Sequence, residues 1–100
     1  MVAQYADFPS EQIADVCRRY RVHELALFGS YQQGTARPDS DVDLLVEFEP
    51  GTEIGFISLA RMGRELSVIL KRQVDLVPKK GLKEAIRLEV LSNTAILYAA

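Results

Sequence analysis

The sequence lacks several features, and each absence narrows the possible classes of protein. It has one cysteine, Cys17, so no disulfide can form within the chain. No apolar run approaches the roughly 20 residues that cross a bilayer, and the N-terminus lacks the basic start and apolar stretch of a secretory signal. There is no basic excess, since the formal net charge is -2, and this disfavours general nucleic-acid binding. We expect a cytoplasmic protein that does not enter membranes.

The composition is that of a folded globular protein. Hydrophobic residues make up 48% of the 100 residues and charged residues 26%. A disordered chain typically has a lower hydrophobic fraction than this. We expect one domain spanning residues 1–100. A domain of this size has little room for a separate acceptor-binding region. A large acceptor would therefore have to supply much of its own binding site.

Apolar spacing and turn residues predict alternating helices and strands. Helices are expected over residues 9–20, 54–70 and 82–91, and strands over 25–28, 42–48, 74–77 and 96–98. A short helical turn is expected over 32–35 and a loop over 37–40. This order predicts an α/β or α+β fold, with a small mixed sheet flanked by helices.

Three kinds of residue have simple structural interpretations. Cys17 lies on the apolar face of the first helix and is expected to be a buried structural thiol. His23 is interpreted as a polar residue that precedes a strand. Four residues of the longest helix recur at helical spacing and are expected in the core, with a partner surface as the alternative. They are Phe56, Leu59, Met62 and Leu66.

Carboxylates alternate with apolar residues at the start of the second strand. Side chains along a strand point to alternate faces, so Asp41 and Asp43 are expected on the face opposite Val42 and Leu44. The same alternation turns Asp75 away from the core. If strands 42–48 and 74–77 are neighbours, the three carboxylates converge.

Three converging carboxylates repel one another unless a cation or a proton neutralises them. Their hard oxygens suit Mg²⁺, which keeps positions for water or phosphate oxygens. Two such ions about 3.5–4 Å apart can clamp the attacking and leaving oxygens of a phosphoryl transfer. The alternative interpretation is that Asp41, Asp43 and Asp75 are surface residues at strand ends.

Gly29 and Ser30 follow the first buried strand directly. Glycine allows close backbone approach to a ligand, and the following turn can offer N–H groups to phosphate oxygens. Two other motifs fail. Thr35 and Ala36 stand where a P-loop needs Lys and Ser or Thr. An EF-hand that begins at Asp39 would need Gly at position 44 and Glu at position 50, where this chain has Leu44 and Pro50.

Charge is distributed unevenly along the chain. Residues 39–53 contain six carboxylates and no Lys or Arg, whereas residues 71–87 contain six basic residues against Asp75 and Glu84. Three interpretations remain open for the basic segment that includes Lys79 and Lys80. The segment could bind a triphosphate, it could bind a partner protein, or it could form a solvated surface.

Together these residues resemble a known signature. Phe28-Gly29-Ser30, a spacer of ten residues and then Asp41-Val42-Asp43-Leu44 resemble the pattern of the polymerase-beta-like nucleotidyltransferases. The stretch LFGSYQQGTARPDSDVDLLVEF, residues 27–48, looks very similar to the minimal nucleotidyltransferases of bacteria and archaea. The strand around Asp75 resembles the third-carboxylate strand of that family. The similarity runs from about residue 10 to residue 98 and implies a palm-like fold.

The resemblance implies a role for each matching residue. It assigns Gly29 and Ser30 to triphosphate binding, Asp41 and Asp43 to metal ligation, and Asp75 to the third catalytic carboxylate. It implies Mg²⁺ in two sites and ATP as nucleotide donor. The chain departs from the family at Gln33, where an arginine is frequent. Two interpretations follow: the missing cation weakens contact with phosphate, or Arg37 substitutes for it.

The family resemblance also implies a partner. Genes of this kind are commonly paired with a helical HEPN-domain ribonuclease, and some members resemble antitoxins that transfer AMP from ATP to a tyrosine of that toxin. A higher-order complex with the toxin is compatible with this. One alternative is a non-catalytic antitoxin that neutralises its partner by binding alone. Another is nucleotide transfer to a small molecule or an RNA end, for which the chain has little room.

Overall fold

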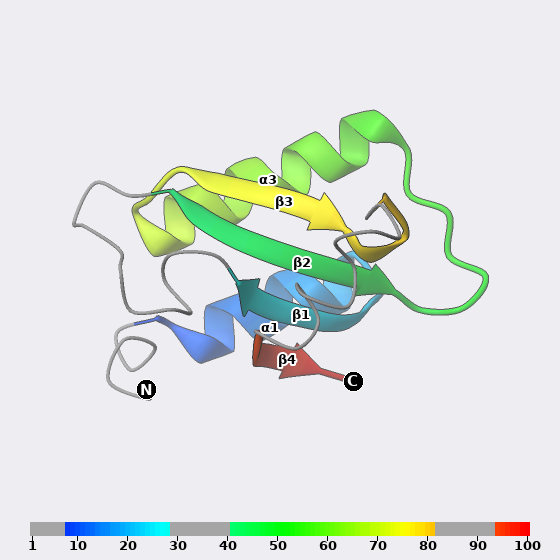
Figure 1. The fold of residues 1–100 in the computed structure, drawn as a ribbon, viewed down its shortest axis with the longest axis horizontal. Helices are drawn as coiled ribbons and strands as arrows, with labels where there is room; N and C mark the ends of the chain where they lie inside the picture. The colour runs from blue at the N-terminus through cyan, green and yellow to red at the C-terminus, as the bar shows by residue number, and fades with distance from the viewer. Residues whose placement is uncertain (1–7, 29–40, 82–93) are drawn as a thin grey trace.

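A computed structural model describes residues 8–28, 41–81 and 94–100 of the chain. The elements, in chain order, are helix α1 (Ser10–Arg19), strands β1 (Val22–Phe28) and β2 (Val42–Phe48), helix α3 (Phe56–Leu70), strand β3 (Val74–Pro78), the 3-10 turn η2 (Lys79–Gly81) and strand β4 (Ala95–Ala99) (Figure 1). The helix predicted over 82–91, the turn over 32–35 and the loop over 37–40 lie outside the described residues.

The four described strands form one mixed sheet in the order β3-β2-β1-β4. Strand β1 lies antiparallel to β2 and to β4, whereas β2 and β3 run parallel. A parallel pair needs a crossover connection, and α3 provides it between β2 and β3. The predicted α/β class and the small mixed sheet are confirmed.

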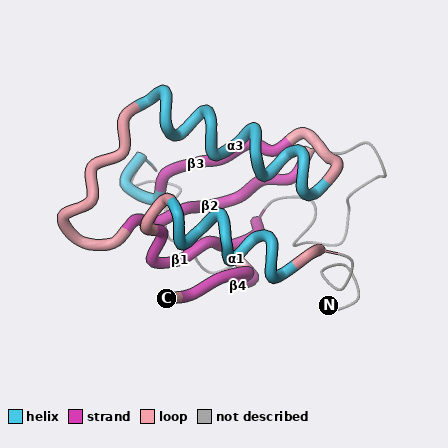
Figure 2. The backbone as a smooth tube through the Cα atoms, turned by 180° about the vertical axis from the view of Figure 1, so that it is seen from behind, coloured by secondary structure: helices cyan, strands magenta, loops and turns pink. Residues whose placement is uncertain are grey.

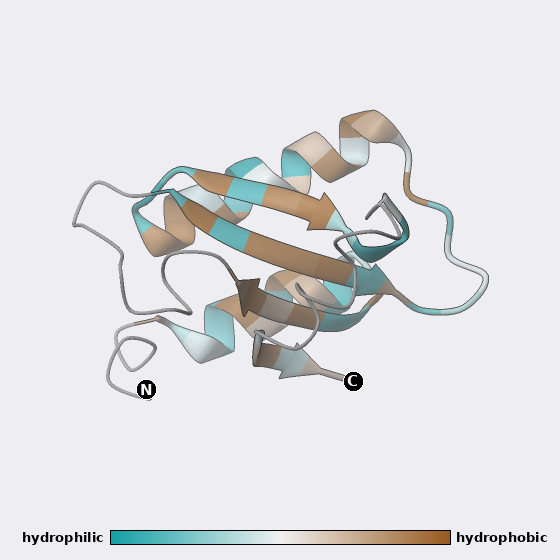
Figure 3. Ribbon diagram, viewed as in Figure 1, coloured by the Kyte–Doolittle hydropathy of each residue, from teal (hydrophilic) through white to brown (hydrophobic). Residues whose placement is uncertain are grey.

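Both described helices pack on the same face of the sheet (Figures 1 and 2). Alternate residues of the strands point to this face, and Figure 3 shows polar bands interrupting the apolar strands. Burial of these alternate residues against the helices removes their apolar surface from water and stabilises the fold. The fully buried core includes Ile13, Val16, Cys17, Leu25, Leu27, Leu44, Met62 and Leu66.

The two helices are also joined by a polar bridge. The Arg19 side chain of α1 donates from Nη2 to Glu65 Oε1 of α3 at 2.7 Å, and the Tyr20 hydroxyl donates to Glu65 Oε2 at 2.5 Å. Glu65 therefore accepts from both residues at the end of α1. None of the helices among the described residues is long and apolar enough to span a membrane.

Two predictions made from the sequence need correction. Strand β1 begins at Val22 rather than residue 25, so His23 lies within the strand and is exposed, instead of preceding it. Pairing of Val22 with Phe48 extends the strand through its polar residues. Phe56 was expected in the core but is 86% exposed, because it is the first residue of α3. Other boundary differences are one or two residues.

Candidate active site

Asp43 and Asp75 face each other across two parallel strands. They are direct register partners of β2 and β3, as are Val42 with Val74 and Leu44 with Leu76. Opposite residues of neighbouring strands share a face and lie about 4.8 Å apart along the hydrogen-bonding direction. Asp41 comes one residue before β2. Convergence of the carboxylates was conditional on strands 42–48 and 74–77 being neighbours, and the structure meets this condition.

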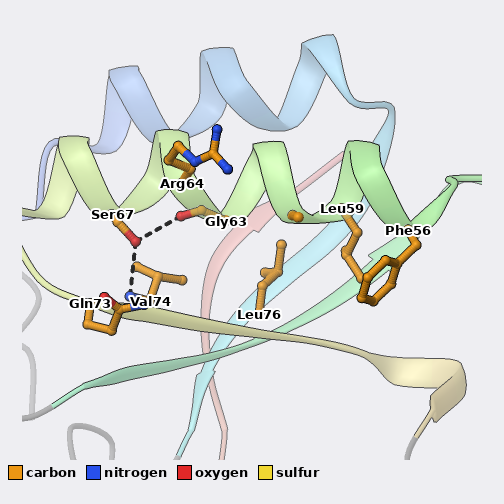
Figure 4. A pocket seen from close by; sticks show the side chains of 9 residues that line it. Phe56, Leu59, Gly63, Arg64, Ser67, Gln73, Val74 and Leu76 are labelled. Carbon is orange, nitrogen blue, oxygen red and sulfur yellow. Dashed lines mark hydrogen bonds between the residues drawn. The ribbon is translucent and has the colours of Figure 1, made fainter.

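Local hydrogen bonds fix the start of β3 beside β2. The backbone N–H of Val42 donates to the Gln73 carbonyl at 2.8 Å. The backbone N–H of Val74 donates to Ser67 Oγ at 3.0 Å, and this hydroxyl donates in turn to the Gly63 carbonyl at 2.9 Å (Figure 4). Ser67 thus ties the last turns of α3 to the first residue of β3. This tie sets the position of Asp75, which follows Val74.

The pKa of Asp43 reflects its burial and the negative charges of Asp75 and Asp41 near it. Partial burial raises the pKa of the Asp43 carboxyl above its ordinary value, and the negative charges of Asp75 and Asp41 raise that pKa further. Asp41 and Asp75 are exposed. The negative charges of Asp75 and Asp41 therefore oppose the ionisation of Asp43.

The carboxylates lie on the face of the sheet opposite the helices. Their neighbours Val42, Leu44 and Val46 are buried against α1 and α3, so strand alternation turns Asp43 away from that core. Farther along the same face, Lys79 Nζ lies 3.3 Å from Glu47 Oε1. Lys79 of the basic segment is therefore paired with a carboxylate of β2.

The donor set fits a hard divalent cation. Asp41, Asp43 and Asp75 offer only carboxylate oxygens, and their mutual repulsion is the property that a cation relieves. In the described part of the chain, no three His, Cys, Asp or Glu side chains are already gathered closely enough to hold a metal ion. Phosphate oxygens or small side-chain rotations would have to complete the coordination.

The other predicted site residues lie outside the described part of the chain. These are Gly29, Ser30 and Arg37, together with Gln33. Phe28, the last residue of β1, is the register partner of Asp43. The Gly29-Ser30 pair therefore follows in sequence from a residue directly opposite the central carboxylate.

Sequence reasoning missed the role of Ser67. Its hydroxyl positions the strand that carries Asp75, although it is eight residues away in the sequence. A signal was present, because serine lowers helix stability and yet stands in an otherwise apolar stretch of α3. Four residues earlier comes Gly63, whose carbonyl accepts from that hydroxyl.

Comparison with known proteins matches this chain to nucleotidyltransferases, both by a family model and by sequence identity. A family model for the nucleotidyltransferase domain matches residues 10–97. The chain is 41% identical over 73 residues to the protein adenylyltransferase MntA of Thermococcus cleftensis, and the alignment covers 73% of this chain and 72% of that protein.

Two solved structures share the fold. A crystal structure of a toxin-antitoxin with AMP-PNP matches with a TM-score of 0.76 at 24% identity, covering 92% of this chain and 74% of that one. A complex of a tri-AMPylated Shewanella oneidensis HEPN toxin with an MNT antitoxin matches with a TM-score of 0.67 at 20% identity, covering 91% and 70%. At these identities the likeness establishes the fold alone.

Proposed function

Because this chain belongs to the nucleotidyltransferase domain family, we propose that it is a cytoplasmic protein adenylyltransferase that transfers AMP from ATP to a tyrosine of a HEPN-domain toxin. In this role it acts as the antitoxin of that toxin. The observation that carries the proposal is the pairing of Asp43 with Asp75 across β2 and β3, in a chain 41% identical to a protein adenylyltransferase.

The related structures support the choice of donor and acceptor. One toxin-antitoxin structure of the same fold contains AMP-PNP, an ATP analogue, and another contains a HEPN toxin that carries three AMP groups. The small size of this chain agrees with a protein acceptor, because a partner can supply the binding surface that a 100-residue chain has little room to build.

The proposed reaction forms one bond and breaks one bond. The acceptor tyrosine oxygen attacks the α-phosphorus of ATP, and the bond from that phosphorus to the oxygen bridging to the β-phosphate breaks. Pyrophosphate leaves with the electron pair of the broken bond. The exposed carboxylate of Asp75 is the candidate to accept the tyrosine proton.

The remaining site residues bind and orient the donor in this proposal. Asp41, Asp43 and Asp75 hold Mg²⁺, most simply as two ions, which would neutralise the triphosphate and stabilise charge on the leaving oxygen. Gly29 and Ser30 bind triphosphate oxygens through backbone N–H groups and the hydroxyl, and Arg37 adds a cation. The partly buried Asp43 lies between the other two carboxylates and orients the metal-binding group.

The test is to incubate the purified chain with ATP, Mg²⁺ and the HEPN-domain protein of the same genome. The mass of the HEPN protein should rise by one or more AMP units. Asp43→Asn should abolish the increase, because it removes a carboxylate charge while keeping the side-chain shape. Glu47→Gln is the matched control, since it makes the same change on the same strand and the same face.

An unchanged mass would contradict the enzymatic proposal if the wild-type chain still formed a complex that blocked the toxin. That outcome would favour an antitoxin that acts by binding alone. AMP transfer by Asp43→Asn at the wild-type rate would contradict the assigned role of the carboxylates.

A further inference from the structure

Helix α3 has an outer face on which apolar and basic side chains are exposed, with Glu65 at its border toward α1. Large apolar side chains are exposed along it, with Phe56 at 86%, Ile57 at 75% and Val68 at 72% exposure. Arg61 and Arg64 lie between them on the same side of the helix and are also exposed. Ile57 and Val68 stand toward the two ends of this strip and the arginines lie between them, so the strip combines apolar and basic side chains, as interaction surfaces rimmed by polar residues do.

This strip borders a groove between α3 and the edge strand β3. The groove has a volume of about 450 Å³. It is lined from the helix by Phe56, Leu59, Ala60, Gly63, Arg64 and Ser67, and from the strand side by Gln73, Val74 and Leu76. Figure 4 shows Leu76 pointing from β3 toward α3, at the floor of the groove. At Gly63 the helix comes close to β3, since a Cβ there would make an ordinary van der Waals contact with Leu76 Cβ at 3.8 Å.

Arg64 has no counter-ion within the described part of the chain, whereas the positive charge of Arg61 acts on Glu65, one turn along α3, and helps to lower the pKa of that carboxyl. The ion pairs found there join Arg19, Arg21 and Lys79 to carboxylates, and neither Arg61 nor Arg64 takes part in one. The nearest carboxylate of α3, Glu65, already accepts from Arg19 and Tyr20. The strip is therefore complementary to a surface that combines apolar side chains with carboxylates.

The edge strand resists pairing with an added β-strand. Because Val42 N–H donates to the Gln73 carbonyl, the alternation of a parallel ladder turns the backbone of Val74, Leu76 and Pro78 outward. Ser67 already accepts from the Val74 N–H, and Pro78 has no N–H. Only the Leu76 N–H is left to donate. An occupant of the groove must therefore bind through its side chains.

We propose that the α3 strip and its groove form the docking surface for the acceptor protein of the proposed reaction, and that the docked segment is an amphipathic helix with carboxylates beside its apolar face. This inference rests on the proposed function for the identity of the partner. An α-helix satisfies its own backbone hydrogen bonds, so it suits a groove whose edge offers few donors. Apolar side chains flank both arginines, which distinguishes the surface from a phosphate-binding one.

The docking surface lies next to the proposed catalytic carboxylates. Val74 and Leu76 line the groove, and Asp75 lies between them with its side chain directed to the other face of the sheet. A helix held along the edge of β3 is thus one strand away from the carboxylate pair. In this proposal the acceptor tyrosine reaches the carboxylates from the docked protein around the β3 edge of the sheet.

The test measures binding of the HEPN-domain protein of the same genome to full-length variants by titration calorimetry. Arg64→Glu should raise the Kd at least about tenfold, because it places a carboxylate opposite the partner's carboxylates. Arg18→Glu is the matched control and should stay within about twofold, since Arg18 is an equally exposed helical arginine without an ion pair in the described part of the chain. Ile57→Asp, a change at an exposed position, should also weaken binding.

Each outcome separates this inference from the proposed function. Wild-type affinity in Arg64→Glu and Ile57→Asp, or no complex with the wild-type chain, overturns the docking surface. If AMP is transferred but binding does not depend on Arg64, the docking surface is wrong and the proposed function stands. If binding depends on Arg64 but no AMP is transferred, the docking surface stands and the proposed function is wrong. Arg64-dependent binding of a labelled RNA in place of the protein also overturns the inference.

Discussion

Asp43 and Asp75 are partners in the parallel register of β2 and β3, although 32 positions separate them in the sequence. The fold brings two negative charges together and withdraws one of them, Asp43, partly from water. Such an arrangement opposes folding in the absence of a cation. It follows that the site contributes unfavourably to the stability of the unliganded chain.

Asp43→Asn should therefore raise the melting temperature by a few degrees at pH 7. Because the folded pKa of Asp43 is raised above its unfolded value, the protonated form favours the fold. Its stabilising contribution is present below the unfolded pKa and is lost as pH rises through the folded pKa. The gain from Asn should thus shrink as the pH is lowered through 4. Thermal melts from pH 3 to pH 8 measure this. The control is Glu53→Gln, because Glu53 is an exposed carboxylate without an ion pair in the described part of the chain. A lower melting temperature of Asp43→Asn at pH 7 would contradict the repulsion.

Added Mg²⁺ should raise the melting temperature of the wild-type chain more than it raises that of the Asp43→Asn variant. Binding to the folded state alone raises stability in proportion to the logarithm of ligand concentration above the Kd. The measurement is the melting temperature against Mg²⁺ concentration, with and without ATP. Na⁺ at equal ionic strength controls for general screening. Equal shifts in the two proteins would argue against Asp43 as a ligand.

Glu65→Gln should lower the melting temperature slightly at pH 7. The hydrogen bond from Arg19 holds the pKa of Glu65 below its ordinary value, and the bond from Tyr20 adds to this. A depressed folded pKa gives stability above the unfolded pKa that is lost as pH falls through the folded pKa. The difference from wild type should vanish in acid. It should be small because the pair is exposed, and Glu11→Gln is the control, since Glu11 is an exposed carboxylate of α1 without an ion pair in the described part of the chain.

Cys17 should be inert in the native chain. Its side chain is fully buried, and burial raises the pKa of the thiol to about 12. The thiolate is the reactive form, so iodoacetamide at pH 8 should label the guanidinium-unfolded chain but not the native one over the same time. Rapid labelling of the native chain would place Cys17 outside the core.

Ser67→Ala should lower both stability and activity. It removes the acceptor of the Val74 N–H, and loss of this partly buried hydrogen bond should cost about 1 kcal/mol. The start of β3 then becomes less fixed, which should slow AMP transfer through Asp75. Ser58→Ala is the control, since it makes the same change in the same helix at a residue without a hydrogen bond in the described structure. Unfolding in urea and the transfer rate measure the two effects.

The site was predictable from sequence to the extent that it depends on strand alternation. The pattern around Asp41 and Asp43 placed carboxylates on one face and apolar residues on the other, and the β2–β3 pairing brought Asp75 to them. Alternation is local, so the sequence carries it.

Features that depend on distant partners were not predictable. Strand β1 extends back to Val22 because Phe48 pairs with it, although His23 and Glu24 interrupt the apolar run. Phe56 has the spacing of a core residue, yet the helix begins there, and its side chain is left exposed. The link from Ser67 to Val74 also joins separate elements.

The alternation in β2 also constrains how this chain can change in length. Deleting one residue within the strand would move Leu44 to the outer face and turn a carboxylate into the core. Natural selection should therefore eliminate insertions and deletions in β2, whichever residue is added or removed. The connection over residues 49–55, with Gly51 at φ 82°, can gain or lose residues at far smaller cost. Length variation among relatives should thus concentrate in that connection.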